Sequence, residues 1–87
     1  MTRDEIKSAV LRVIAEIAPE ADPSSIDPQA RFRDQLDIDS VDFLNFVIGL
    51  HKQFRVDIPE ADYPQLATLD SCIQYLVSVT EARGPAD

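Results

Sequence analysis

A serine set among aspartates stands where an acid-rich stretch gives way to an apolar one. Residues 36–44 read Leu-Asp-Ile-Asp-Ser-Val-Asp-Phe-Leu, and Ser40 lies at the junction. Asp39 or Ser40 can accept hydrogen bonds from the first free N–H groups of a helix, and Asp42 adds favourable negative charge to its first turn. The stretch therefore predicts a helix that begins at Ser40, where most serines serve only as caps.

The groups that would turn Ser40 into a catalytic nucleophile are missing. His51 lies eleven residues further on, about three helical turns away, so it cannot act as a general base within the same helix. We expect it to be a polar surface residue, and Cys72 to be a small core residue. The four aspartates in residues 34–42 lack the spacing, glycine and terminal glutamate of a calcium loop. The sequence predicts no enzyme activity and no metal site.

The chain before Ser40 is expected to form one helix and a long ordered loop. Thr2 and Glu5 have the spacing of a capping box, and Pro19 ends the helix that they begin. Residues 19–39 contain three prolines and read as a loop, which is unusual in so small a domain unless it is functional or anchored. The expected inward residues of the helix are Ile6, Val10, Val13, Ile14 and Ile17. The expected anchors of the loop are Ile26, Phe32 and Leu36.

The second helix, from about residue 40 to about residue 54, is the most apolar part of the chain. Apolar periodicity places Val41, Leu44, Val47 and Phe54 toward the core, with Leu50 and Ile48 at the edges. Phe43 and Phe46 then fall on other faces. Some apolar surface is therefore expected to stay exposed, as in a contact surface.

Two further helices complete an all-α bundle. Pro59 suits the first turn of a short third helix, which Pro64 either limits to about one turn or only kinks, and Thr68 is placed to cap a fourth. No strand periodicity and no internal repeat is found. We predict one domain over residues 1–83 and a flexible tail over residues 84–87.

Length and charge narrow the classes of function. Eighty-seven residues form one small domain, and the net charge of −8 argues against nucleic acid and anionic membranes as partners and for basic protein patches. Residues 19–39 hold six acids against two bases. A single cysteine suits a reducing compartment, early apolar runs are interrupted by charge, and none approaches the ~20 residues of a membrane span. We expect a cytoplasmic protein.

Three segments resemble the acyl carrier protein family, in order and at its spacings. The sequence Asp-Ser-Val-Asp at residues 39–42 is similar to the family's Asp-Ser-Leu-(Asp/Glu) signature. Residues 32–36 (Phe-Arg-Asp-Gln-Leu) match its lead-in, and residues 54–59 (Phe-Arg-Val-Asp-Ile-Pro) match the segment after its second helix. Residues 69–76 look like its last helix. The resemblance covers nearly the whole chain and implies a four-helix bundle with a long loop between helices one and two.

What the resemblance implies is a carrier with 4′-phosphopantetheine, derived from coenzyme A, on the Ser40 hydroxyl beside Asp39. It implies a phosphopantetheinyl transferase and acyl-loading ligase or synthase enzymes with basic docking patches as partners, and a monomer. The docking residues that it implies are Asp37, Val41, Asp42, Phe43 and Phe46. The residues that it implies for an acyl-chain pocket are Val47, Ile58 and Leu66. Gly49 would leave room for such a chain, permit a close helix approach, or reflect neutral drift.

Departures from the family pattern leave alternatives open. Val41 replaces the commoner leucine, and the exposed positions of the second helix lack the usual glutamates. We therefore expect a specialised stand-alone carrier that serves fatty-acid, lipid or polyketide-type synthesis. A peptidyl or aryl carrier usually shows Gly-Gly-(His/Asp)-Ser, absent here, whereas a D-alanyl carrier fits the size and charge. The remaining alternative is an unmodified helical interaction module in which Ser40 is only a cap.

Overall fold

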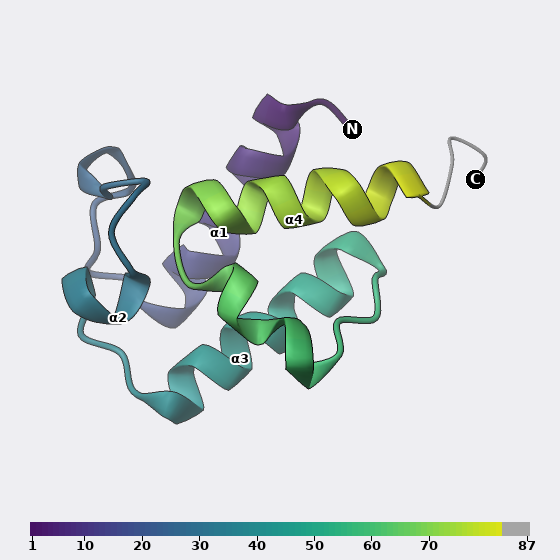
Figure 1. Cartoon of the computed structure of the whole chain (residues 1–87). Coiled ribbons are helices and arrows are strands. Elements are labelled where there is room, and N and C mark those ends of the chain that lie inside the picture. Colours follow the sequence, from purple (N-terminus) through teal and green to yellow (C-terminus); the bar gives the residue numbers. More distant parts are fainter. Residues whose placement is uncertain (83–87) are drawn as a thin grey trace.

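Helices joined by loops build the part of the chain that the computed structural model describes, residues 1–82, which contains one isolated β-bridge, between Arg31 and Thr68, and no strand (Figure 1). They are α1 (Arg3–Ile17), η1 (Pro23–Ser25), α2 (Phe32–Gln35), α3 (Ser40–Phe54), η2 (Glu60–Leu66) and α4 (Leu69–Ala82). Helix α1 packs on both α3 and α4, and η2 packs on α4. The predicted all-α bundle with a long first loop is confirmed. The predicted domain end at residue 83 and the tail over residues 84–87 lie outside the described residues.

The helix starts follow the predicted caps. At α1, the Glu5 N–H donates to the Thr2 hydroxyl (3.1 Å) and the Thr2 N–H donates to the Glu5 carboxylate (2.7 Å). The bonds with Thr2 lower the pKa of Glu5, because they favour its charged form. At α4, the Ser71 N–H donates to the Thr68 hydroxyl (3.0 Å). Pro64 does not end the third helix but lies inside η2, which is a 3₁₀ helix.

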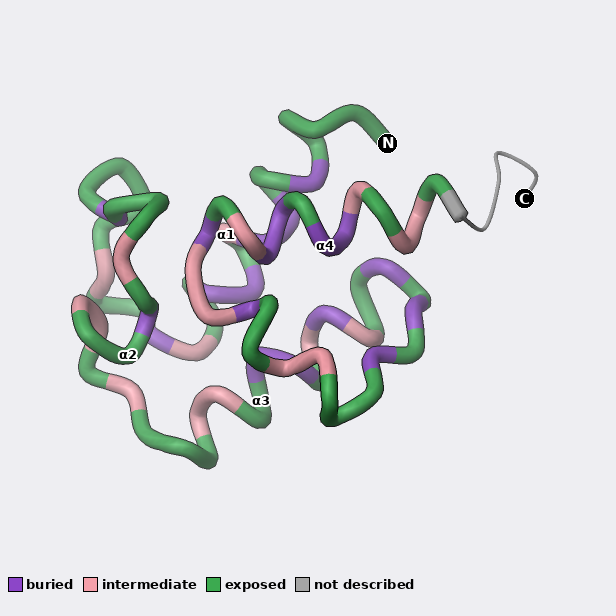
Figure 2. The backbone as a smooth tube through the Cα atoms, in the orientation of Figure 1, coloured by how far each residue is buried: buried purple, intermediate pink, exposed green. Residues whose placement is uncertain are grey.

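The predicted inward face of α3 is wrong at its first half. Val41 and Leu44 are 64% and 47% exposed, whereas Phe46, predicted on another face, is only 2% exposed. Leu50 is fully buried rather than at an edge. Figure 2 shows buried, intermediate and exposed residues along α3. Apolar residues occupy every side of this helix, so periodicity could not select the side that meets the bundle. The face that does so consists of Phe46, Val47, Leu50 and Phe54.

Helices α1 and α3 approach each other closely at a glycine. A Cβ atom added to Gly49 would lie 2.6 Å from Cγ1 of Val13, closer than side chains tolerate. Of the three explanations that the sequence left open for Gly49, the structure supports the close helix approach.

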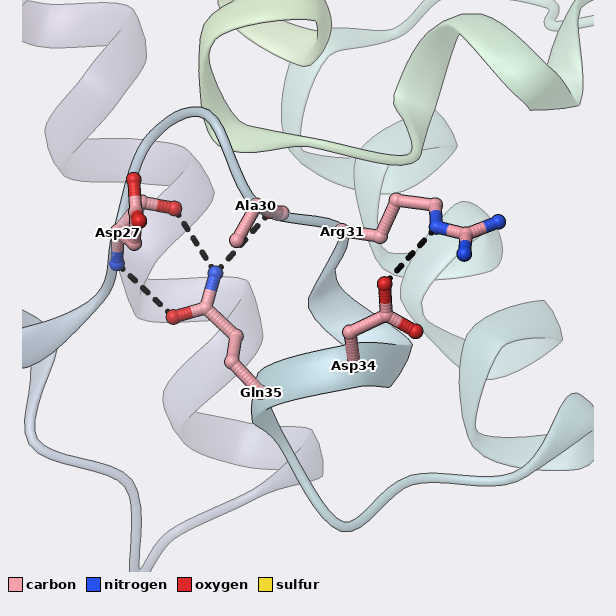
Figure 3. Close-up of polar contacts among 5 residues, drawn as sticks. All are labelled: Asp27, Ala30, Arg31, Asp34 and Gln35. Carbon is pink, nitrogen blue, oxygen red and sulfur yellow. Dashed lines mark hydrogen bonds and ion pairs between the residues drawn. The ribbon is translucent and has the colours of Figure 1, made fainter.

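The long loop is fastened to the bundle by apolar and polar contacts. Phe32 and Ile26 are buried, and Leu36 packs partly buried against the core. The Gln35 side-chain amide accepts from the Asp27 N–H (2.9 Å) and donates to the carbonyls of Asp27 (2.8 Å) and Ala30 (3.1 Å), which closes the turn before α2 (Figure 3). Burial of the predicted anchors is confirmed, and the glutamine clamp adds to them.

Backbone bonds join the same loop to the far end of the chain. The Phe32 N–H donates to the Ala67 carbonyl (2.8 Å), and the Asp70 N–H donates to the Pro28 carbonyl (3.0 Å). Helix α2 is therefore held against the junction of η2 and α4, close to the start of α3. None of the helices within residues 1–82 is long and apolar enough to cross a membrane.

Candidate functional site

Ser40 is the exposed first residue of α3, and its neighbour performs the capping. The Asp42 N–H donates to Oδ1 of Asp39 (2.9 Å), and the Asp39 N–H donates to Oδ2 of Asp42 (3.1 Å). The sequence left open whether Asp39 or Ser40 caps this helix, and the structure assigns the cap to Asp39. Within the described residues, the Ser40 hydroxyl forms no hydrogen bond with another protein group, so it is available for covalent attachment.

The backbone N–H groups at the start of α3 stabilise the negative charge of the Asp39 carboxylate. The pKa of Asp39 is lowered, first by the hydrogen bond from the Asp42 N–H and further by that from the Val41 N–H. These backbone donors are the ones that would otherwise bind an anion at a helix N-terminus. A phosphate on Ser40 would therefore have to share this site with Asp39. Within residues 1–82, no three acidic, histidine or cysteine side chains are grouped closely enough to hold a metal ion.

The predicted docking residues separate into an exposed and a buried set. Val41 and Asp37 are exposed, and Asp42 and Phe43 are partly buried. Phe46 is buried, with its ring centroid 5.4 Å from that of Phe32 and 5.9 Å from that of Phe43. The prediction that Phe46 faces outward is wrong, because this phenylalanine fills the core between α2 and α3.

The residues predicted for an acyl-chain pocket lie together in the core. Val47 and Leu66 are fully buried and Ile58 is 3% exposed. His51, predicted to be a polar surface residue, is partly buried and accepts a hydrogen bond at Nε2 from the Ile58 N–H (3.1 Å). The histidine thereby satisfies a backbone donor where the chain leaves α3. His51 and Ile58 are seven residues apart, and no sequence pattern predicts a bond between a side chain and a backbone N–H at that spacing.

A groove that the sequence did not reveal opens beside the start of α3. Its volume is about 660 Å³, and α2, α3 and η2 all contribute to its walls. Phe43 lies on its α3 side, with its ring centroid 6.4 Å from that of Tyr63 of η2. The residues that line the groove are Arg31, Arg33, Asp34, Phe43, Tyr63, Pro64 and Ala67. They come from segments far apart in sequence, so no local sequence motif predicts the groove.

Comparison with known proteins assigns the fold and the site to a family. Residues 8–76 match the family described as "Phosphopantetheine attachment site". The structure is similar to that of the acyl carrier protein from Enterococcus faecalis, with a TM-score of 0.75 and 27% identity, covering 90% of this chain and 98% of that chain. An exposed serine hydroxyl at a helix start fits such an attachment site.

Similar relatives are acyl carrier proteins of several kinds. The chain is 30% identical over 81 residues to the meromycolate extension acyl carrier protein of Mycobacterium tuberculosis (93% of this chain, 70% of that protein). It is 29% identical over 77 residues to the acyl carrier protein of Rubrobacter xylanophilus (88% and 94%). The mitochondrial acyl carrier protein of Neurospora crassa is 28% identical over 82 residues, which is 94% of this chain but 61% of that protein's length.

This chain belongs to the acyl carrier protein family, in which the protein is a noncatalytic carrier and the prosthetic group is 4′-phosphopantetheine. The predicted family, cofactor and lack of enzyme activity are confirmed by this membership. Membership also implies that a phosphopantetheinyl transferase and synthase enzymes act on the chain.

Proposed function

We propose that this protein carries acyl intermediates of fatty-acid, lipid or polyketide-type synthesis on an arm attached to Ser40. The observation that carries the proposal is that capping and the exposed hydroxyl belong to two different residues at the start of α3. Asp39 caps the helix, so the exposed Ser40 hydroxyl can be esterified without loss of the cap.

The chemistry at Ser40 is a phosphoryl transfer assisted by a partner enzyme. Ser40 Oγ would form a bond to the β-phosphorus of coenzyme A, the bond to the adenosine-bearing phosphate would break, and the serine proton would pass to a base of the transferase. No base of this chain is needed, which agrees with the position of His51 at the other end of α3. When attached, the group supplies a terminal thiol that holds acyl groups as thioesters. Tethering raises their effective concentration at each partner site.

The outward face of α3 supports a docking role next to the attachment site. Val41, Leu44 and Ile48 are large apolar side chains that are 64%, 47% and 41% exposed. An exposed apolar patch beside charged residues is a common contact surface. We assign docking to this face together with Asp37, Asp42 and Phe43. Because the face is more apolar than acidic, it fits a specialised carrier with dedicated partners.

The interior offers a second, more demanding place for cargo. A fatty chain lying between Val47, Ile58 and Leu66 would have to separate side chains that are now buried in the hydrophobic core. This pocket therefore requires the core to open, and the cost of opening would favour short acyl groups. For the compartment we propose the cytoplasm, since the single thiol, Cys72, is free and buried.

Intact mass after incubation with coenzyme A and a broad-specificity phosphopantetheinyl transferase tests the attachment site. The unaltered protein should gain one phosphopantetheine, and peptide mapping should locate it at Ser40. Ser40→Ala should gain none while its helical circular dichroism persists. Ser8→Ala, which removes an exposed serine of α1, is the matched control and should load normally.

Two results would contradict the proposal. Loading of Ser40→Ala would place the arm elsewhere. No loading of the folded, unaltered protein, while a control carrier loads under the same conditions, would leave only a helical interaction module.

A further inference from the structure

The groove beside α3 begins one helical turn from Ser40. Phe43 lines the groove and lies three residues after Ser40. Residues three apart are neighbours on a helix surface and differ by about 4.5 Å along its axis. An arm attached to the Ser40 hydroxyl can therefore reach this groove without crossing the exposed apolar side chains Val41, Leu44 and Ile48.

The charge of the groove is opposite to that of its surroundings. Residues 19–39 contain two bases, Arg31 and Arg33, and both line the groove. Only one acid, Asp34, lines it with them, so two positive charges against one negative charge leave a net charge of +1. The whole chain carries −8. An anionic group near Ser40 is thus repelled by Asp37, Asp39 and Asp42. The positive charge of the groove attracts it.

The donors of Arg31 are only partly used. Its Nε–H donates to Oδ2 of Asp34 at 3.0 Å, and the dashed line in Figure 3 ends at this nitrogen and not at either of the two terminal ones. A guanidinium has five N–H donors in a planar fork that matches a carboxylate with two parallel bonds. Within residues 1–82, Arg33 forms no ion pair with an acid. Both arginines can therefore accept a further anionic partner.

The walls of the groove are held in place by contacts already described. The bond from the Phe32 N–H to the Ala67 carbonyl fixes the segment that bears both arginines against the η2 end. The rings of Phe43 and Tyr63, which both line the groove, pack edge to face. A lining that combines the aromatic surface of Phe43 and Tyr63 with two guanidinium groups suits a short aliphatic segment that ends in a negative charge.

We infer that this groove is a binding subsite for acyl cargo whose far end carries a carboxylate, with Arg31 and Arg33 as its anion-binding residues. The inference rests on the proposed attachment at Ser40 and names the class of cargo that this chain shelters. The methylene carbons of the cargo lie on Phe43 and Tyr63, and the terminal carboxylate pairs with the guanidinium groups. The phosphate of the arm is bonded to Ser40 and is present in every loaded form. Any effect of this phosphate on the arginines is therefore the same with each cargo.

Two cargoes of equal length test the subsite. The transferase is supplied with succinyl-coenzyme A or butyryl-coenzyme A, which differ in a terminal carboxylate against a methyl group. Intact mass first verifies that each arm is attached. In ¹⁵N-edited spectra, the Nε–H signals of Arg31 and Arg33 should shift with succinyl cargo and not with butyryl cargo or the unacylated arm. Nuclear Overhauser contacts should join the succinyl methylenes to the rings of Phe43 and Tyr63.

Substitutions in opposite directions sharpen the test. Arg31→Gln and Arg33→Gln should each lower the bound fraction of succinyl cargo about two- to fivefold, the range for exposed charge pairs. Arg12→Gln, an exposed cation of α1 away from the groove, should leave it unchanged. Asp34→Asn removes the competing carboxylate and should raise the bound fraction, because Arg31 is released and the groove gains positive charge.

The outcomes separate this inference from the attachment site. If no mass is gained, Ser40 attachment fails and the subsite fails with it. If the arms attach but the spectra of the succinyl and butyryl forms agree at Arg31 and Arg33, only the subsite is overturned. Shifts shared by all loaded forms would assign the arginines to the arm's phosphate, which also overturns the cargo inference.

Discussion

The two faces of α3 are built from similar residues and differ in burial. On one face, Leu50 and Val47 are fully buried against the rest of the bundle. On the other, Leu44 and Ile48 keep 47% and 41% of their surface exposed. Folding requires only the first face, since the core is complete without the second. An apolar face that folding does not require is best explained by contact with partners, and it lies beside Ser40 at the helix start.

Two leucines on opposite faces give the largest expected difference. Leu50→Ala should lower the free energy of unfolding by about 2–5 kcal/mol, because it removes a fully buried side chain and leaves a cavity. Leu44→Ala should change it by about 0.5 kcal/mol or less, as surface substitutions do. Urea denaturation followed by circular dichroism measures both. Equal losses would mean that the outward face also holds the fold together and would remove the case for docking there.

A glycine on the core side offers a finer probe of the same packing. In Gly49→Ala, the clash with Val13 should lower the free energy of unfolding by about 1–3 kcal/mol. The higher helix propensity of alanine should offset ~1 kcal/mol of this loss. Val13→Ala in the same chain removes the clashing methyl group. The double variant should therefore be more stable than the sum of the two single losses predicts, by thermal or urea unfolding. Simple additivity would show that α1 and α3 do not need this close approach.

The sequence was sufficient for the long helices α1, α3 and α4 and for a short third helix, but it placed η1 and α2 inside a loop and did not identify the inward face of α3. Caps such as Thr2 with Glu5, and breakers such as Pro19, act on neighbouring residues, so helix bounds could be predicted locally. The inward face of α3 could not, because its apolar residues surround the helix and only the position of α1 selects Phe46 and Leu50. The arginine groove and the bond between His51 and Ile58 depend on how distant segments meet, which no local pattern contains.

The prediction with the smallest effect concerns the acid cap where the outward face of α3 begins. The folded-state pKa of Asp39 is lowered from its ordinary value of 3.8, so its cap contributes stability above that value and loses it as the pH falls through the folded pKa. Asp39→Ser replaces the carboxylate with a hydroxyl that does not titrate, as Thr2 does at α1. The stability advantage of the unaltered protein over Asp39→Ser should therefore shrink in acid, and the Asp39 carboxyl signal in ¹³C spectra should titrate below 3.8. A constant difference across this pH range would mean that the negative charge of Asp39 adds nothing to the cap of α3.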